Sequence, residues 1–156
     1  MIAAAHVIFD GSTDTTDLAE ILSHLQKQLP FSCRMTEWQG YTMVIPQIRV
    51  ETHVPLTIQI DDDPEYVPEE IQELAAAAVG ILSIEDVEKL RRCRVRLDIM
   101  SASPARIEET DESISLYAET DLDPADDDVE SVLFALSNFL RGYVFDCVNG
   151  KWLLLN

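Results

Sequence analysis

The residues from Ile48 to Ile60 alternate between apolar and polar side chains with a period of two. Such alternation is typical of a β-strand, because successive side chains of a strand point to opposite faces of its sheet. The segment therefore predicts one long strand in a sheet with one buried face and one wet face. Pro55 falls in the outward-facing set and indicates an edge position or a bulge, since proline donates no ladder hydrogen bond.

Four other segments carry apolar residues at intervals of three and four, which is the spacing of an amphipathic helix. Asp17 with Glu20 has the spacing of a capping pair at the start of the first segment, and Ser83 with Asp86 has it at the start of the third. The fourth segment opens at Asp123-Pro124. The predicted helices are 18–29, 68–79, 84–90 and 124–141.

Two hairpins are indicated, one around Gln39-Gly40 and one around Asn149-Gly150, which has the strongest short-range hairpin signal. The connection Ser101–Glu112 is polar and acidic, so we expect an exposed loop there. The predicted strands are Ile2–Phe9, Cys33–Trp38, Tyr41–Pro46, Ile48–Ile60, Arg94–Met100, Ser113–Glu119, Tyr143–Val148 and Lys151–Leu155.

The resulting element order is β-α-β-β-β-α-α-β-β-α-β-β. It predicts a single α+β domain over residues 1–156, with a mostly antiparallel sheet and the helices packed on one face. The spacing also indicates two related β-α-β-β halves that meet near Lys89–Arg96, although no residue-level repeat is visible.

The distribution of charge is the second constraint. Two stretches, Val50–Glu88 and Ile107–Leu140, contain no lysine or arginine, and each holds eleven carboxylates. They set the net charge of −18. A field of this sign repels nucleic acid and anionic membranes, and it attracts a basic partner at an enhanced association rate. We therefore predict a basic protein as the partner, with no nucleic acid and no membrane.

No apolar run approaches the roughly 18 residues that a membrane-spanning helix needs. The apolar segment Met1–Phe9 lacks a basic region and carries His6, so it indicates a buried strand and not a signal peptide. The cysteines Cys33, Cys93 and Cys147 form no Cys-x-x-Cys pair, which indicates reduced, buried thiols. We expect a cytoplasmic protein.

The acidic runs lack the spacing of a dedicated calcium loop, which needs a glycine at its sixth position and a glutamate at its twelfth. Counted from Asp61, these positions hold Tyr66 and Gln72, and the count from Asp121 fails in the same way. No glycine-rich phosphate cradle and no Gly-x-Ser-x-Gly elbow is present either.

Other catalytic patterns are equally absent. His6, His24 and His53 have no neighbour at metal-ligand spacing, and we expect His6 to be a hydrogen-bonded core residue. Runs such as Asp126-Asp127-Asp128 are better explained by solvation and helix capping than by general acid–base chemistry. Asp98 lies inside the predicted strand Arg94–Met100, on its outward face. We predict no metal, no cofactor and no enzymatic activity.

The one basic cluster is Arg91–Arg96, which holds four arginines. Its acidic neighbours in sequence are Glu85, Glu88 and Asp98. We expect these arginines to neutralise the nearby acids and not to bind nucleic acid, because the field of the whole chain opposes phosphate.

The candidate contacts for a basic partner are the carboxylates of two acidic segments and two tryptophans beside hairpin turns. A partly exposed tryptophan at a turn is a favoured interface anchor, and core packing at the end of a sheet is an equally common role. The candidates are Asp61, Asp62, Asp63, Glu65, Glu69, Glu70, Asp121, Asp123, Asp126, Asp127, Asp128, Trp38 and Trp152.

In size, acidity, absence of catalytic motifs and α+β pattern, the chain resembles the small cytosolic immunity proteins of bacterial polymorphic-toxin systems. The resemblance implies a tight one-to-one complex with a cognate toxin, whose basic active cleft the acidic protein covers. Two alternatives stay open. One is a secretion chaperone or adaptor for another basic protein, with an acidic DNA mimic as a special case, and the other is an enzyme whose site is assembled from scattered residues.

Overall fold

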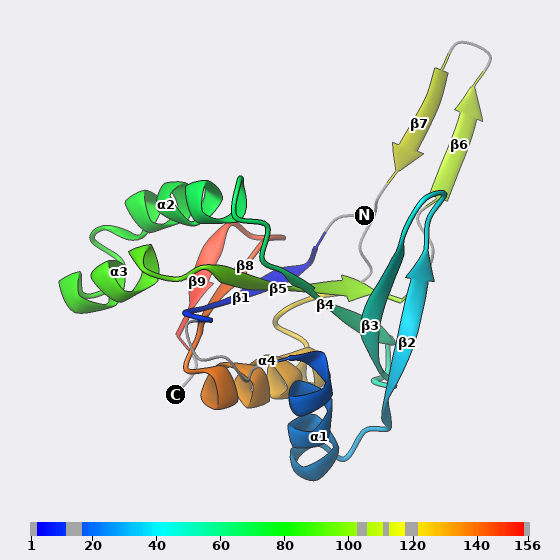
Figure 1. The fold of residues 1–156 in the computed structure, drawn as a ribbon, viewed down its shortest axis with the longest axis horizontal. Helices are drawn as coiled ribbons and strands as arrows, with labels where there is room; N and C mark the ends of the chain where they lie inside the picture. The colour runs from blue at the N-terminus through cyan, green and yellow to red at the C-terminus, as the bar shows by residue number, and fades with distance from the viewer. Residues whose placement is uncertain (1–2, 12–16, 103–105, 111–112, 118–121, 155–156) are drawn as a thin grey trace.

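A computed structural model describes residues 3–11, 17–102, 106–110, 113–117 and 122–154 (Figure 1). Within them, seven strands form an open antiparallel sheet in the order β2-β3-β4-β5-β1-β8-β9, and β6 pairs with β7 in a separate hairpin. The fold class is α+β, as the sequence predicts. The strands are β1 (Ala5–Phe9), β2 (Cys33–Gln39), β3 (Val44–Val50), β4 (Leu56–Asp61), β5 (Val95–Ser101), β6 (Arg106–Thr110), β7 (Ser113–Tyr117), β8 (Tyr143–Asp146) and β9 (Lys151–Leu153). The helices are α1 (Leu18–Gln28), α2 (Val67–Ala78), α3 (Ile84–Arg91) and α4 (Asp127–Leu140).

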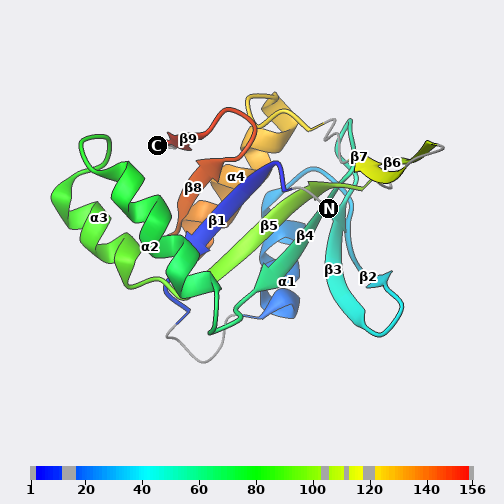
Figure 2. The same cartoon turned by 90° about the horizontal axis from the view of Figure 1, so that it is seen from above.

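Helices cover both faces of the large sheet (Figures 1 and 2). Val7 of β1 belongs to the core shared with α1 and α4, whereas the next residue, Ile8, belongs to the core shared with α2 and α3. Both side chains are fully buried. The prediction that the helices pack on one face is therefore wrong. Its physical reason is visible in β1, whose continuous apolar run needs cover on both sides.

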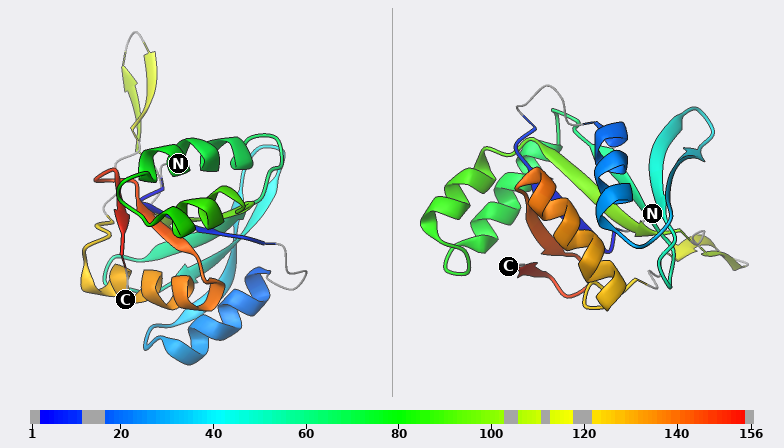
Figure 3. Two further views of the ribbon diagram at one scale, coloured as in Figure 1. Left: turned by 90° about the vertical axis from the view of Figure 1, so that its left-hand side faces the viewer. Right: turned by 90° about the horizontal axis from the view of Figure 1, so that it is seen from below.

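The main core lies between the sheet and the pair α1 and α4, which pack side by side (Figure 3). Ile21 and Leu25 of α1 and Leu133 of α4 are fully buried there. At the rim of this pair, the His24 ring stacks on Phe139 at a centroid distance of 4.2 Å. His24 therefore has a packing role between the two helices.

The alternating segment Ile48–Ile60 is two strands and not one. β3 ends at Val50 and β4 begins at Leu56, and the chain reverses direction between them. The Thr52 hydroxyl donates a hydrogen bond of 2.7 Å to the Val54 carbonyl inside this turn. Because the apolar parity is the same before and after the turn, the periodicity alone did not reveal it.

Two further boundaries differ from the sequence prediction. The connection Ser101–Glu112 contains β6, which pairs with β7 through positions such as Ile107 and Leu116. α4 begins at Asp127 and not at Pro124, because the carboxylate of Asp126 caps the helix by accepting the Asp128 N–H.

The end of α4 depends on two adjacent residues. Arg141 adopts the left-handed conformation (φ 52°), and its N–H donates to the Ser137 carbonyl. Gly142 then passes close to β1, since a Cβ at this position would lie 2.8 Å from the Ile8 carbonyl oxygen. Glycine is required at position 142 because another backbone segment passes close to it. The left-handed residue that ends the helix is Arg141, not the glycine.

Candidate functional site

The first candidate region is the segment that joins β4 to α2. We call the residues Asp61–Glu70 the acidic corner. Asp62, Glu65 and Glu69 are exposed, and their side chains make no hydrogen bond or ion pair with another described residue. These three carboxylates are therefore available to a partner, and they stand near the positive end of the α2 dipole.

Of the other three carboxylates of the acidic corner, Asp63 accepts the Glu65 N–H at 2.8 Å, and the remaining two are held by a buried arginine. Arg96 is only 8% exposed. Its Nη2 donates to Asp61 Oδ2 at 3.1 Å, and its Nη1 donates to Glu70 Oε2 at 2.5 Å. Its Nε donates to Asp98 Oδ1 at 2.8 Å. The arginine therefore fastens the start of α2 to strands β4 and β5.

His6 completes this cluster, because its Nδ1 lies 2.8 Å from Asp98 Oδ1. The prediction that His6 is a hydrogen-bonded core residue is confirmed. Asp98 is largely buried on the face that α2 covers, so its predicted place on a wet face is wrong. Burial opposes the charge of Arg96, but Asp98 and Glu70 outweigh this effect, and the pKa of the guanidinium is raised. Arg96 therefore remains charged, and the cluster acts as a structural clamp.

Tyr66 links the exposed and buried parts of the acidic corner. Its hydroxyl donates a short hydrogen bond to Asp61 Oδ2. This bond to a carboxylate, helped by partial burial, raises the pKa of Tyr66 to about 12. The tyrosine therefore remains neutral at physiological pH and keeps Asp61 turned inward.

This bond predicts a specific alkaline titration. In the wild-type protein, ¹³C-tyrosine NMR should place the Tyr66 midpoint at about 12, and Asp61→Asn should move it toward the ordinary value of about 10. Since the pKa in the folded state lies above that in the unfolded state, the stability from this bond is present below about pH 10 and is lost as the pH rises through about 12. Asp62→Asn is the matched control and should leave the midpoint in place. An unchanged midpoint in Asp61→Asn would contradict the assignment.

The second predicted acidic segment, 121–128, lies in another part of the fold, and several of its carboxylates have structural roles. Asp128 accepts a hydrogen bond of 2.9 Å from the His53 N–H, in the connection that precedes β4. Asp126 caps α4, and Asp123 accepts the Ala125 N–H at 2.9 Å. Asp127 is exposed. Asp121 lies outside the described residues.

The two acidic segments therefore do not form one surface. The His53 contact of Asp128 lies before β4 begins, and Asp61 is the last residue of β4. The segments are separated by the length of this strand, roughly 20 Å, and they border helices on opposite faces of the sheet (Figure 1). A compact binding site for a partner can therefore include only one of the two acidic segments.

A second group of exposed residues is apolar and lies at one hairpin turn. We call Trp38–Val44, the turn between β2 and β3, the hairpin tip. Tyr41 is fully exposed, Met43 and Val44 are each 56% exposed, and Trp38 is 36% exposed. A Cβ on Gly40 would lie 2.6 Å from the Trp38 ring, so the ring packs over this glycine. Trp38 is therefore a partly exposed aromatic group with a fixed position.

The hairpin tip and the acidic corner share one end and one face of the sheet. β3 starts at the tip, and β4, which runs antiparallel to β3, ends at Asp61 (Figure 2). Strand alternation places Trp38, opposite Ile45, on the same face as Asp61, opposite Arg96. Figure 1 shows the β2–β3 hairpin bending toward the side that carries α2. The apolar anchor and the three exposed carboxylates thus lie toward the same end and the same face of the sheet.

The sequence analysis named Trp38 as a candidate contact and did not name the other exposed residues of the hairpin tip. Hairpin turns are usually polar, because Gly, Asn, Asp and Ser satisfy turn geometry. A turn that presents Tyr41, Met43 and Val44 departs from this rule. This departure was the feature of the sequence that could have indicated an exposed apolar surface at the turn.

Trp152 is a core residue, which is the second of the two roles that the sequence analysis considered for it. It is 7% exposed and packs edge-to-face on Phe145 in the core beneath α2 and α3, with ring centroids 5.1 Å apart. Its side chain cannot act as a surface anchor without leaving the core.

The cysteines offer no nucleophile among the described residues. All three are free, and burial raises the pKa of Cys93 and of Cys147 to about 12. Burial also raises the pKa of Cys33. Each is therefore a neutral thiol at physiological pH, without the thiolate that nucleophilic chemistry needs.

No group of three or more His, Cys, Asp or Glu side chains in the described part of the chain is arranged to hold a metal ion. None of the helices described is long and apolar enough to span a membrane. Comparisons with protein-family models, with curated proteins and with solved structures find no match to this chain.

Proposed function

We propose that this protein is a non-catalytic interaction protein that binds a basic protein partner through the hairpin tip and the acidic corner. The observation that carries the proposal is the placement of Trp38 and Tyr41 at the same end of the sheet as the free carboxylates Asp62, Glu65 and Glu69. Binding energy at protein interfaces is concentrated in a few aromatic anchors, and charged rims mainly set the association rate and the choice of partner.

The charge of the chain supports a basic partner. The net charge of −18 attracts a cationic surface from a distance, and the acidic corner gives this attraction a local target. The Arg96 clamp holds Asp61 and Glu70, the two ends of the acidic corner, so the segment that carries the exposed carboxylates is fixed at both ends. A rigid surface loses less conformational entropy on binding.

For the partner we propose a bacterial toxin with a basic active cleft, the class that the resemblance to immunity proteins implies. The occupied cleft would be inaccessible to its anionic substrate. A secretion substrate or another cellular basic protein would use the same surface, and the identity of the captured partner distinguishes these cases.

The test is an affinity capture from cells that produce the protein naturally, with two baits in parallel. One bait is the wild-type chain and the other is Trp38→Ser/Tyr41→Ser. We expect one stoichiometric basic protein to remain on the wild-type bait after a high-salt wash and to be absent from the variant. The proposal fails if the two baits retain the same proteins, or if all basic proteins leave the wild-type bait together at high salt. If one basic protein is captured as expected, inhibition of its activity by the wild-type chain would identify it as a toxin.

A further inference from the structure

The large sheet has two edges, and their strands differ in length. β9, at one edge, has three residues, whereas β2, at the other, has seven. Figure 2 shows β2 as the outermost strand on its side of the sheet. A long edge strand is a template for another strand, and proteins usually shorten it or interrupt it with proline, lysine or a bulge. β2 contains neither proline nor lysine, and its register with β3 is unbroken from Cys33 to Gln39.

The hydrogen bonds at the two ends of β2 show which of its backbone groups face outward. Before the strand, the Glu51 N–H donates to the Ser32 carbonyl. After it, the Gly40 N–H donates to the Met43 carbonyl. In an antiparallel pair, the residues that exchange hydrogen bonds alternate along each strand. The even-numbered residues of β2 therefore bond to β3, and the N–H and C=O groups of its odd-numbered residues point away from the sheet.

The first outward position supports this assignment and is already occupied. The Gln26 side chain of α1 donates from Nε2 to the Cys33 carbonyl at 3.1 Å. The outward positions that follow are Met35, Glu37 and Gln39, which are exposed, and their backbone groups have no partner among the described residues. We call Met35–Gln39 the open edge. It offers unpaired N–H donors and C=O acceptors at every second residue, and it leads directly into the hairpin tip.

The side chains of β2 indicate the charge of the strand that the open edge would accept. Arg34 Nη2 lies 3.7 Å from Glu51 Oε1, so its charge has a partner within the domain. The exposed Glu37 carboxylate forms no ion pair with a described residue. A second copy of the chain would bring its own net charge of −18 and would be repelled. A basic strand would be attracted by the same charge.

We propose that the open edge binds an extended basic segment of the partner as a further strand of the sheet. The outward backbone groups of Met35, Glu37 and Gln39 form the hydrogen bonds of the added strand, which supply the affinity in this mode of recognition. A lysine or arginine opposite Glu37 supplies the selectivity, because opposite charges on directly opposed residues stabilise a strand pair. This inference deepens the proposed function and rests on it for the choice of a basic partner.

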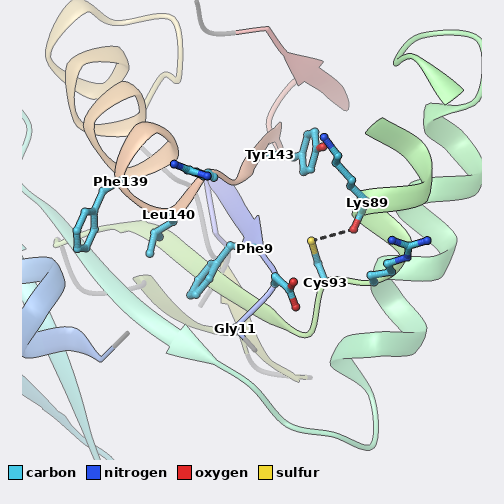
Figure 4. Close-up of a pocket in the computed structure, with 10 residues that line it drawn as sticks. Phe9, Gly11, Lys89, Cys93, Phe139, Leu140 and Tyr143 are labelled. Carbon is cyan, nitrogen blue, oxygen red and sulfur yellow. Dashed lines mark hydrogen bonds between the residues drawn. The ribbon is translucent and has the colours of Figure 1, made fainter. Parts of the chain in front are cut away.

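The probe is a capped peptide as long as β2, in which valine and lysine alternate. It is titrated into the full chain at physiological ionic strength and followed by ¹H–¹⁵N NMR. We expect saturable shifts and slower hydrogen exchange at the amides of Met35, Glu37 and Gln39. Gly11 and Cys93 provide the reference amides in the same spectra, because they line a pocket that residues of β1, α3, α4 and β8 surround and that β2 does not reach (Figure 4).

Two variants at one position separate the backbone from the side chain. Glu37→Pro removes an outward N–H, and the strand should persist because the bonds to β3 come from the even-numbered residues. We expect it to weaken peptide binding by about fivefold or more, since one hydrogen bond is lost and the proline ring obstructs the edge. Glu37→Gln is the matched control, which removes the same charge and keeps the N–H. Its loss of affinity should be smaller.

A further control leaves the protein unchanged. A peptide with the same side chains but methylated backbone nitrogens should not saturate the open edge. Equal binding of this peptide, or of one with glutamate in place of lysine, would overturn the proposal. An absence of shifts in β2, or shifts confined to the reference amides, would overturn it too. If the β2 amides shift with protein concentration alone, the open edge belongs to a second copy and the proposal fails.

These outcomes are distinguishable from those of the affinity capture. A captured partner together with an unshifted open edge would contradict this inference and leave the proposed function standing. A saturated open edge without a captured partner would support the strand-accepting edge and contradict the proposed dedicated partner.

Discussion

Arg96→Met is expected to lower the free energy of unfolding by about 3–5 kcal/mol, because it removes one partner of a buried ion cluster. Methionine can fill the space of the arginine stem, but it leaves Asp61, Glu70 and Asp98 facing one another without a cation. Urea denaturation followed by circular dichroism measures the loss.

Two further variants test this explanation. Arg94→Met removes an exposed arginine just before the same strand and should change the stability by no more than about 0.5 kcal/mol. Arg96→Lys keeps the charge but lacks the planar fork, so its loss should be intermediate. A similar loss in Arg94→Met and Arg96→Met would show that the cluster does not stabilise the start of α2.

Trp38→Ser/Tyr41→Ser should weaken binding of the captured basic partner by about 100-fold or more, since an aromatic anchor at an interface contributes about 2 kcal/mol or more. Both side chains are at least partly exposed, so the fold should persist. Because the tip supplies short-range contacts, most of the change should appear in the dissociation rate. Surface plasmon resonance with the purified partner measures both rate constants.

The control for this variant is Val79→Ser/Ile81→Ser. It removes two exposed apolar residues from the turn between α2 and α3, away from the hairpin tip (Figure 1). Its affinity for the partner should match that of wild type. If the control weakens binding and the tip variant does not, the partner surface lies at the α2–α3 turn.

Features that depend on a few neighbouring residues were predictable from the sequence. The capping pairs are confirmed, since Asp17 accepts the Glu20 N–H and Ser83 accepts the Asp86 N–H. The Asn149-Gly150 hairpin also forms, with β8 and β9 on either side. Each of these signals acts within one turn of chain, so the surrounding fold has little influence on it.

Features that depend on distant parts of the chain were not predictable. Alternation showed that Asp98 faces away from the first core, but it could not show that α2 covers that second face. The partners of Arg96 in α2 and β4 are 26 and 35 residues away in the sequence. The sequence proximity of Arg96 and Asp98 did indicate one pair of the cluster, and that pair is confirmed.

The candidate site was predictable only in part, because the role of each carboxylate depends on contacts with distant parts of the chain. Composition identifies acidic segments, but it does not separate carboxylates that cap helices from those that remain free. The carboxylates of Asp126 and Asp128 accept backbone hydrogen bonds, whereas those of Asp62 and Glu65 accept none from a described residue. Only the arrangement of strands shows that these exposed carboxylates lie toward the same end of the sheet as the hairpin tip.

The most direct test of the proposed function compares two variants of equal net charge. Asp62→Asn/Glu65→Gln/Glu69→Gln neutralises the acidic corner, and Glu20→Gln/Asp127→Asn/Glu130→Gln neutralises three exposed acids at the starts of α1 and α4. The association rate constant for the captured partner is measured by stopped-flow fluorescence at a series of ionic strengths.

We expect the first variant to associate more slowly than wild type and to lose much of its salt dependence, while the second keeps a salt dependence close to that of wild type. Equal slowing in both variants would mean that only the overall charge of −18 attracts the partner, and it would contradict a binding surface at the acidic corner.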